Sequence, residues 1–113
     1  MPSVIFDIDN TKIETVQALA EEAESLDYHI SIITGTPATE RLAYSVKLDD
    51  MGIPYDRLIM NTTGKNTVTA KISVVAVLQS PLEIIYFVSD DTGFITGCEH
   101  LGLQRVTGPN QFA

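Results

Sequence analysis

Two aspartates stand near the start of the chain, directly after a short apolar run. Val4, Ile5 and Phe6 favour a buried strand, and Asp7 and Asp9 follow where the apolar pattern ends. Carboxylates at that end of a strand lie where open parallel sheets bind ligands. Two interpretations are open on these residues alone: an Asp-rich turn, or a site whose carboxylate oxygens hold Mg²⁺ for a phosphorylated ligand.

Polar groups follow two further expected strands. The run His29 to Ile33 ends in Thr34 and Gly35, and the run Ile84 to Ser89 ends in two acidic residues, Asp90 and Asp91. Because the carboxyl ends of parallel strands share one edge of a sheet, we expect all of these groups at one site. Thr36 and Pro37 are explained as a helix N-cap and first helical residue, but Thr34 and Gly35 are not. A hydroxyl and backbone amides at that position suit a phosphoryl oxygen.

The elements that must position these groups alternate between strand and helix. Thr11 and Glu14 match a capping box that opens the first helix, which leaves only Asn10 between Asp9 and helical backbone. The run Thr69 to Gln79 is rich in β-branched residues, yet we expect a helix because consecutive parallel strands need a crossover. The remaining expected elements are a helix over 37–51, a strand over 55–60, a helix over 93–101 and an edge strand over 103–106.

Length and net charge limit the number of domains and the ligands that the chain can attract. The 113 residues predict one domain over 1–113, and seven Lys and Arg against fifteen Asp and Glu give a net charge of −8, which repels nucleic acid and phosphorylated ligands. A phosphate site must therefore be built locally. No membrane span or signal segment is recognised, so the expected compartment is the cytoplasm. The single Cys98 predicts an inert core thiol, and His29 and His100 lack metal-ligand spacing.

With these motifs in order, the chain resembles the haloacid dehalogenase (HAD) superfamily of phosphotransferases. The matching segments are D-I-D-N-T at Asp7 to Thr11, I-I-T-G at Ile32 to Gly35, Lys71, and V-S-D-D at Val88 to Asp91. The resemblance implies a Rossmann-like three-layer α/β/α domain with a parallel five-stranded sheet. It also implies a hydrolase of phosphate monoesters that needs magnesium.

The resemblance assigns a role to each matching residue. Asp7 would be the nucleophile that forms an aspartyl-phosphate, and Asp9 the acid and base. Thr34, Gly35 and Lys71 would hold the phosphoryl group. The Mg²⁺ ligands would be Asp7, Asp9, Asp90 and Asp91, and Asn10 is assigned to substrate binding.

Two lysines compete for the phosphoryl-binding position. Lys71 opens the helix that leads into the fourth strand, as the lysine of the family does, whereas Lys65 lies in a Gly-containing loop. We assign Lys71 to catalysis and Lys65 to substrate binding.

Within the superfamily, the chain looks most like the phosphatase domain of polynucleotide kinase 3′-phosphatases. The pattern runs from I-I-T-G-T-P through Arg41 and M-G-I-P-Y-D to Lys71. The expected substrate is therefore a phosphorylated small molecule or a nucleic-acid 3′ end. The sequence departs from that pattern in two ways: Lys65 is the only charge in the segment after Met60, and no cap or flap hairpin fits after Asp9. A second copy of the chain covering the open site is one way to exclude water.

Two rival interpretations remain open. A receiver domain of two-component signalling also uses acidic residues, Thr or Ser, Lys and Mg²⁺, but its phosphorylated Asp follows the third strand, where this chain has Met60 and Asn61. The second rival is a non-catalytic member that keeps a metal or phosphate site and serves as a binding module.

Overall fold

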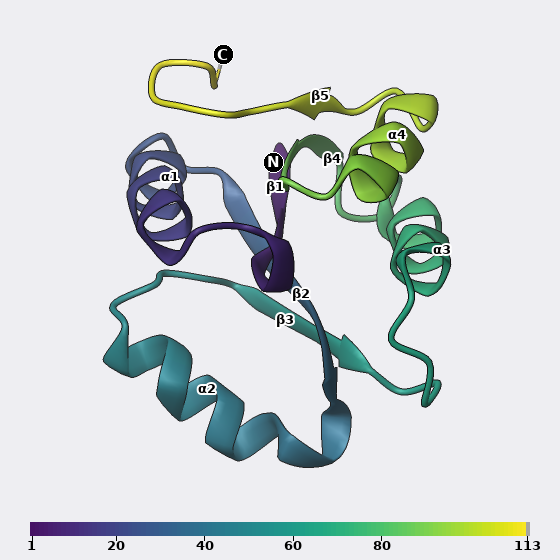
Figure 1. Ribbon diagram of the computed structural model, residues 1–113. Coiled ribbons are helices and arrows are strands. Elements are labelled where there is room, and N and C mark those ends of the chain that lie inside the picture. The colour runs from purple at the N-terminus through teal and green to yellow at the C-terminus, as the bar shows by residue number, and fades with distance from the viewer. Residues whose placement is uncertain (113) are drawn as a thin grey trace.

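The first apolar run forms the centre of a parallel sheet in the computed structural model, which describes residues 1–112 (Figure 1). Every residue of β1 (Ser3–Asp7) is buried, because the strand has neighbours on both sides and helices on both faces. Over the described chain the sheet has five strands in the order β3-β2-β1-β4-β5. The other strands are β2 (His29–Pro37), β3 (Arg57–Asn61), β4 (Ile84–Val88) and β5 (Gln104–Arg105). The predicted five-stranded parallel sheet is confirmed.

The helices form a layer on each face of this sheet. In Figure 1, α1 (Ile13–Ser25) and α2 (Arg41–Asp50) lie on the left, and α3 (Val68–Leu78) and α4 (Thr92–His100) lie on the right. Each pair closes its own hydrophobic cluster. Val16 and Leu48 belong to the first cluster, and Val75 and Phe94 belong to the second. The α/β/α layering follows because alternate side chains of each buried strand face opposite clusters.

The β-branched segment after the third strand is a helix, as the need for a crossover predicted. Thr67 caps α3, since its hydroxyl accepts a hydrogen bond from the Ala70 amide at 3.1 Å. The helix packs against α4 and supports the connection from β3 to β4. Tertiary packing therefore overrides the strand propensity of Ile72, Val74 and Val75.

The predicted capping box at the first helix is wrong. The N-cap of α1 is Lys12, which makes no side-chain capping bond. Thr11 instead donates its hydroxyl to the Asp7 carbonyl at 2.8 Å, which closes a short 3-10 turn, η1 (Ile8–Asn10). The chain thus passes from β1 to α1 through η1 and two further residues, with no hairpin in 8–12.

The predicted helix start at Thr36 and Pro37 is also wrong. Strand β2 continues to Pro37 and is followed by η2 (Ala38–Glu40) before α2 begins at Arg41. Pairing with β3 is interrupted after Ile33 and resumes at Pro37 opposite Asn61. The strand ladder therefore holds Pro37 in extended backbone, and the interruption falls on 34–36.

A search of 1–112 finds no helix with the length and apolar character of a membrane span.

Candidate functional site

The polar ends of β1, β2 and β4 meet at one edge of the sheet. Asp7 ends β1, Ser89 follows β4, and Thr34 lies in β2 directly after its last residue paired with β1; all three are buried. The turn η1 is fastened to the end of β4, because the Asp90 amide donates to the Asn10 carbonyl at 3.0 Å. Asp7, Asp9, Asn10, Thr34, Gly35 and Lys71, which are distant in sequence, are joined here by hydrogen bonds.

Asp7 lies at the bottom of this site and is fully buried. One carboxylate oxygen pairs with Lys71 Nζ at 2.8 Å. The other accepts the Ser89 hydroxyl at 2.7 Å and the Asn10 side-chain amide at 3.2 Å. A buried carboxylate needs such partners to remain ionised, and these contacts hold Asp7 in one orientation.

Asp9 accepts hydrogen bonds from three donors on two elements, β2 and α3. Thr34 donates its hydroxyl to Oδ1 at 2.8 Å, and the Gly35 amide donates to Oδ2 at 2.7 Å. Lys71 Nζ contacts Oδ2 at 3.1 Å. We call these three groups, the Thr34 hydroxyl, the Gly35 amide and the Lys71 ammonium, the oxyanion cradle. A hydroxyl, an amide and an ammonium converging on two oxygens form a general binding site for a tetrahedral or planar anion.

The break in the β2–β3 ladder makes the cradle possible. Between Ile33 and Pro37 the strand is not in regular register with β3, so the Gly35 amide is available to Asp9. The Gly35 carbonyl accepts a hydrogen bond from the Asn61 side chain at 3.3 Å. Thr34 and Gly35 therefore occupy an irregular segment whose polar groups serve the site rather than the sheet.

The contacts in this site shift the pKa of both Asp9 and Lys71. Burial alone would raise the pKa of Asp9, but the hydrogen bonds from Gly35, Thr34 and Lys71 outweigh it, and the pKa lies below its ordinary value. Burial alone would lower the pKa of Lys71, but Asp7 and Asp9 outweigh it, and that pKa is raised. Both groups are therefore charged at neutral pH in this arrangement.

The acidic pair after β4 divides between two environments. The Asp90 side chain is 58% exposed and contacts Arg105 at 3.3 Å, whereas Asp91 Oδ1 caps α4 by accepting the Phe94 amide at 2.9 Å. Asp91 also lines a cavity of about 230 Å³ together with Asp9, Asn10 and Lys71. Asp91 therefore shares a cavity with Asp9, whereas Asp90 pairs with Arg105.

The donor set suits Mg²⁺ in chemistry, although it is not a preformed cage. Among residues 1–112, no group of three or more His, Cys, Asp or Glu is placed to hold a metal. Mg²⁺ usually keeps several waters and uses one or two carboxylates together with substrate oxygens, so a protein cage is not required. Asp91 offers one such carboxylate in the cavity that Asp9 also lines.

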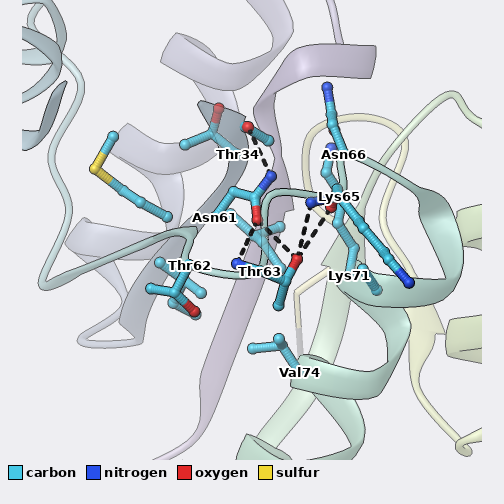
Figure 2. Close-up of a pocket in the computed structure, with 13 residues that line it drawn as sticks. Thr34, Asn61, Thr62, Thr63, Lys65, Asn66, Lys71 and Val74 are labelled. Carbon is cyan, nitrogen blue, oxygen red and sulfur yellow. Dashed lines mark hydrogen bonds between the residues drawn. The ribbon is translucent and has the colours of Figure 1, made fainter. Parts of the chain in front are cut away.

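Lys65 lies in the loop 62–67, which follows β3. The Thr63 hydroxyl accepts from the Lys65 amide at 3.1 Å, and Asn61 Oδ1 accepts from the Thr63 amide at 2.9 Å, so the loop is folded on itself (Figure 2). Lys65 lines a small cavity of about 40 Å³ that Thr34 and Lys71 also line, but its own side chain is exposed. The structure therefore places Lys71 in the cradle and Lys65 at the rim.

Three residues of the site were not predicted from the sequence. Ser89 supports Asp7, and its position directly before the acidic pair was the available signal. Tyr44 lies within hydrogen-bonding reach of Thr34, and burial raises its pKa. Asn66 packs its amide against Gly35, in the space that a Cβ at residue 35 would occupy. No local pattern marks Tyr44 or Asn66, because only the fold brings them to the site.

Comparison with known proteins identifies the fold. No protein-family model matches the sequence, and no curated protein matches it. A solved structure of a Pnkp1/Rnl/Hen1 complex contains a similar chain, with a TM-score of 0.71, 15% identity, and coverage of 95% of this chain and 45% of that chain. A structure of the Pnkp1/Rnl/Hen1 RNA repair complex gives a TM-score of 0.67 at 14% identity, covering 95% of this chain and 42% of that one. The likeness is one of fold. This chain spans less than half of each matched chain.

Proposed function

We propose that the protein is a Mg²⁺-dependent phosphohydrolase that acts through an aspartyl-phosphate on Asp7. An Asp7 oxygen attacks the phosphorus of a monoester, and the bond to the leaving oxygen breaks as Asp9 gives that oxygen a proton. Asp9 then takes a proton from water, which attacks the phosphorus and releases Asp7 and inorganic phosphate. Covalent catalysis of this kind divides one high barrier into two lower ones.

The observation that supports this proposal is the oxyanion cradle. The Thr34 hydroxyl, Gly35 amide and Lys71 ammonium converge on the two oxygens of Asp9 at 2.7–3.1 Å. Three donors that hold carboxylate oxygens at these distances are equally suited to phosphoryl oxygens. The nearby Asp7 carboxylate, which shares Lys71 with the cradle, is the nucleophile in reach of a phosphorus held there.

Magnesium is part of this proposal. Asp7, the Asp9 main-chain carbonyl and Asp91 would hold it, and Asp90 is the weaker candidate because its carboxylate pairs with Arg105. Bound there, the ion would offset the repulsion between a carboxylate nucleophile and an anionic phosphate.

The finer proposal is that the substrate carries its phosphate at a nucleic-acid 3′ end. The fold likeness to part of a chain in an RNA repair complex supports it. The short connection between β1 and α1 supports it as well, because the site then lacks a flap that would obstruct a large substrate.

The rival interpretations differ in what they lead us to expect. The receiver interpretation conflicts with the sheet, since receivers have the strand order 2-1-3-4-5 and this chain has β3-β2-β1-β4-β5. A non-catalytic phosphate-binding module has the same cradle but no turnover. Activity is therefore the property that distinguishes an enzyme from a binding module.

The experiment is a Mg²⁺-dependent phosphatase assay on wild type, Asp7→Asn and Ser73→Ala. Asp7→Asn removes the nucleophile while keeping the side-chain shape, so we expect a loss of at least about 10³-fold in turnover and no acid-stable phosphoprotein. Ser73→Ala, an exposed change on α3, serves as the control and should retain activity. Turnover by Asp7→Asn at the wild-type rate would refute the mechanism.

A further inference from the structure

A cavity of about 530 Å³ lies between the 3-10 turn η2 and the loop 62–67, with Gly35 at its inner end. Because the Gly35 amide belongs to the cradle and Gly35 also lines this cavity, the group that a bound phosphoryl carries can extend into it. We call this cavity the leaving-group groove.

The lining of the leaving-group groove carries no charge. It consists of glycine, proline, alanine, threonine and asparagine, and no Lys, Arg, Asp or Glu of the described chain contributes to it. Lys65 lies in the adjoining loop but lines the smaller cavity instead. Electrostatic affinity for a nucleic-acid backbone comes from Lys and Arg that neutralise its phosphates, and the net charge of −8 makes a background attraction still weaker.

The lining nevertheless offers hydrogen bonds. Thr39, Thr62 and Asn66 make no side-chain hydrogen bond to any other residue within 1–112, so their hydroxyl and amide groups are available to a ligand. Asn61, by contrast, is engaged with Thr63 and Gly35 (Figure 2). Hydroxyls and amides of this kind match the hydroxyl and carbonyl groups of a sugar or nucleoside.

Asn66 lies where the leaving-group groove meets the cavity of Asp9 and Lys71. It lines the leaving-group groove, the cavity shared by Asp9 and Lys71, and the small cavity shown in Figure 2. Its amide packs over Gly35, where any larger side chain at residue 35 would collide with it. A group that extends from the cradle into the groove is therefore within reach of the Asn66 amide.

From these observations we infer that the leaving group is an uncharged, hydrogen-bonding molecule of about nucleoside size, and that Asn66 is its specificity-determining contact. This inference rests on the proposed phosphatase function. Where the substrate is a nucleic-acid 3′ end, the groove holds the terminal nucleoside and gains nothing from the phosphates of the preceding strand.

The kinetic test compares two substrates with the same reacting group. Thymidine 3′-monophosphate and a ten-residue oligothymidylate with a 3′-phosphate are assayed at 50 and 300 mM NaCl. The expected kcat/KM values agree within about threefold, with little change with salt. An oligonucleotide advantage above tenfold that is lost at 300 mM would overturn the inference, because each contacted strand phosphate contributes a log–log salt slope near −0.7.

Variants test the role of Asn66 directly. Asn66→Ala should raise KM for thymidine 3′-monophosphate about tenfold, the loss expected for one or two hydrogen bonds, and should change kcat/KM for 4-nitrophenyl phosphate much less. Ser73→Ala, the exposed change on α3, serves as the control and should alter neither. An equal effect of Asn66→Ala on both substrates would assign the residue to the cradle rather than to the groove.

Binding measurements test this inference independently of the proposed phosphatase activity. Calorimetry measures the affinities for thymidine 3′-monophosphate and for inorganic phosphate. The two proteins compared are Asp7→Asn and the double variant Asp7→Asn with Asn66→Ala. A loss for the nucleotide alone supports the groove even where no substrate is turned over, in which case only the phosphatase proposal fails. Equal affinity of both proteins for the nucleotide refutes the groove.

Discussion

At the scale of single residues, Asp9 is in an arrangement that its proposed role cannot use. A general acid must carry a proton, but the cradle lowers the pKa of Asp9 and keeps it ionised. Its carboxylate also accepts bonds from the groups proposed to hold the phosphoryl oxygens. Substrate binding must therefore displace this carboxylate, which frees the cradle and the acid together.

This displacement can be measured with inorganic phosphate. Asp9→Ala empties the cradle, whereas Asp9→Asn removes the charge and leaves a side chain that still reaches the donors. We expect Asp9→Ala to bind phosphate more tightly than Asp9→Asn by about tenfold in calorimetry, because the donors no longer have a competing acceptor. Equal affinities in the two variants would mean that only charge, and not occupancy, matters.

The Asp7–Lys71 pair is the second feature at this scale. Asp7 is fully buried and Lys71 is 8% exposed, so removal of the ammonium leaves a buried charge with neutral partners alone. We expect Lys71→Met to lower the free energy of unfolding by about 3–5 kcal/mol in urea titrations. The double variant Asp7→Asn with Lys71→Met should recover much of that loss. No recovery would show that Lys71 stabilises the fold through its packing rather than through its charge.

At the scale of elements, the approach of α3 to α4 depends on a glycine. A Cβ built at Gly97 would lie 2.6 Å from Cδ1 and Cγ1 of Ile72, which is too close for packed carbons. Glycine within a helix normally costs about 1 kcal/mol relative to alanine. Here the close contact of the two helices offsets that cost.

Gly97→Ala therefore has opposite expected effects in two backgrounds. In wild type it should lower the free energy of unfolding by about 1–2 kcal/mol, because Ile72 cannot move away without disturbing its neighbours. In Ile72→Ala the side-chain atoms that clash are gone, and the same change should be neutral or stabilising. A double-mutant cycle from urea titrations measures the difference, and additive effects would contradict this account.

At the scale of the whole molecule, the buried Cys98 makes the free energy of unfolding depend on pH in the alkaline range. Burial raises the pKa of its thiol from the ordinary value of 9.0 to about 12. Between these values the unfolded chain loses the thiol proton and the folded chain keeps it, so the free energy of unfolding falls as pH rises. Below pH 9 both states are protonated, and Cys98 adds no pH dependence.

Cys98→Ala isolates this effect from the tyrosines and lysines that also titrate there. From pH 9 to pH 11, wild type should lose up to about 1.4 kcal/mol of stability per pH unit more than the variant. Chemical denaturation at several pH values gives both curves. Parallel curves would show that the thiol ionises in the folded protein without penalty.

The sequence by itself determined most of the fold. Apolar runs at Val4, Ile30 and Phe87 predicted buried parallel strands, because a strand covered on both faces requires continuous hydrophobicity. The crossover requirement correctly predicted the helix α3 against the propensity of its residues. The convergence of Asp7, Asp9 and Thr34 also followed from the parallel strands, which bring their carboxyl ends to one edge, whereas Lys71 was assigned from the family resemblance.

Only the tertiary structure decided which group each side chain contacts. Thr11 and Thr36 matched helix caps in sequence, but Thr11 bonds to Asp7 and Thr36 lies beside Thr34 in the site. A hydroxyl forms a hydrogen bond with whichever partner the fold brings nearest, and sequence spacing does not contain that information. Ser89 and Asn66 reached the site for the same reason. Their contacts join segments 82 and about 31 residues apart, which only the packed sheet and its loops bring together.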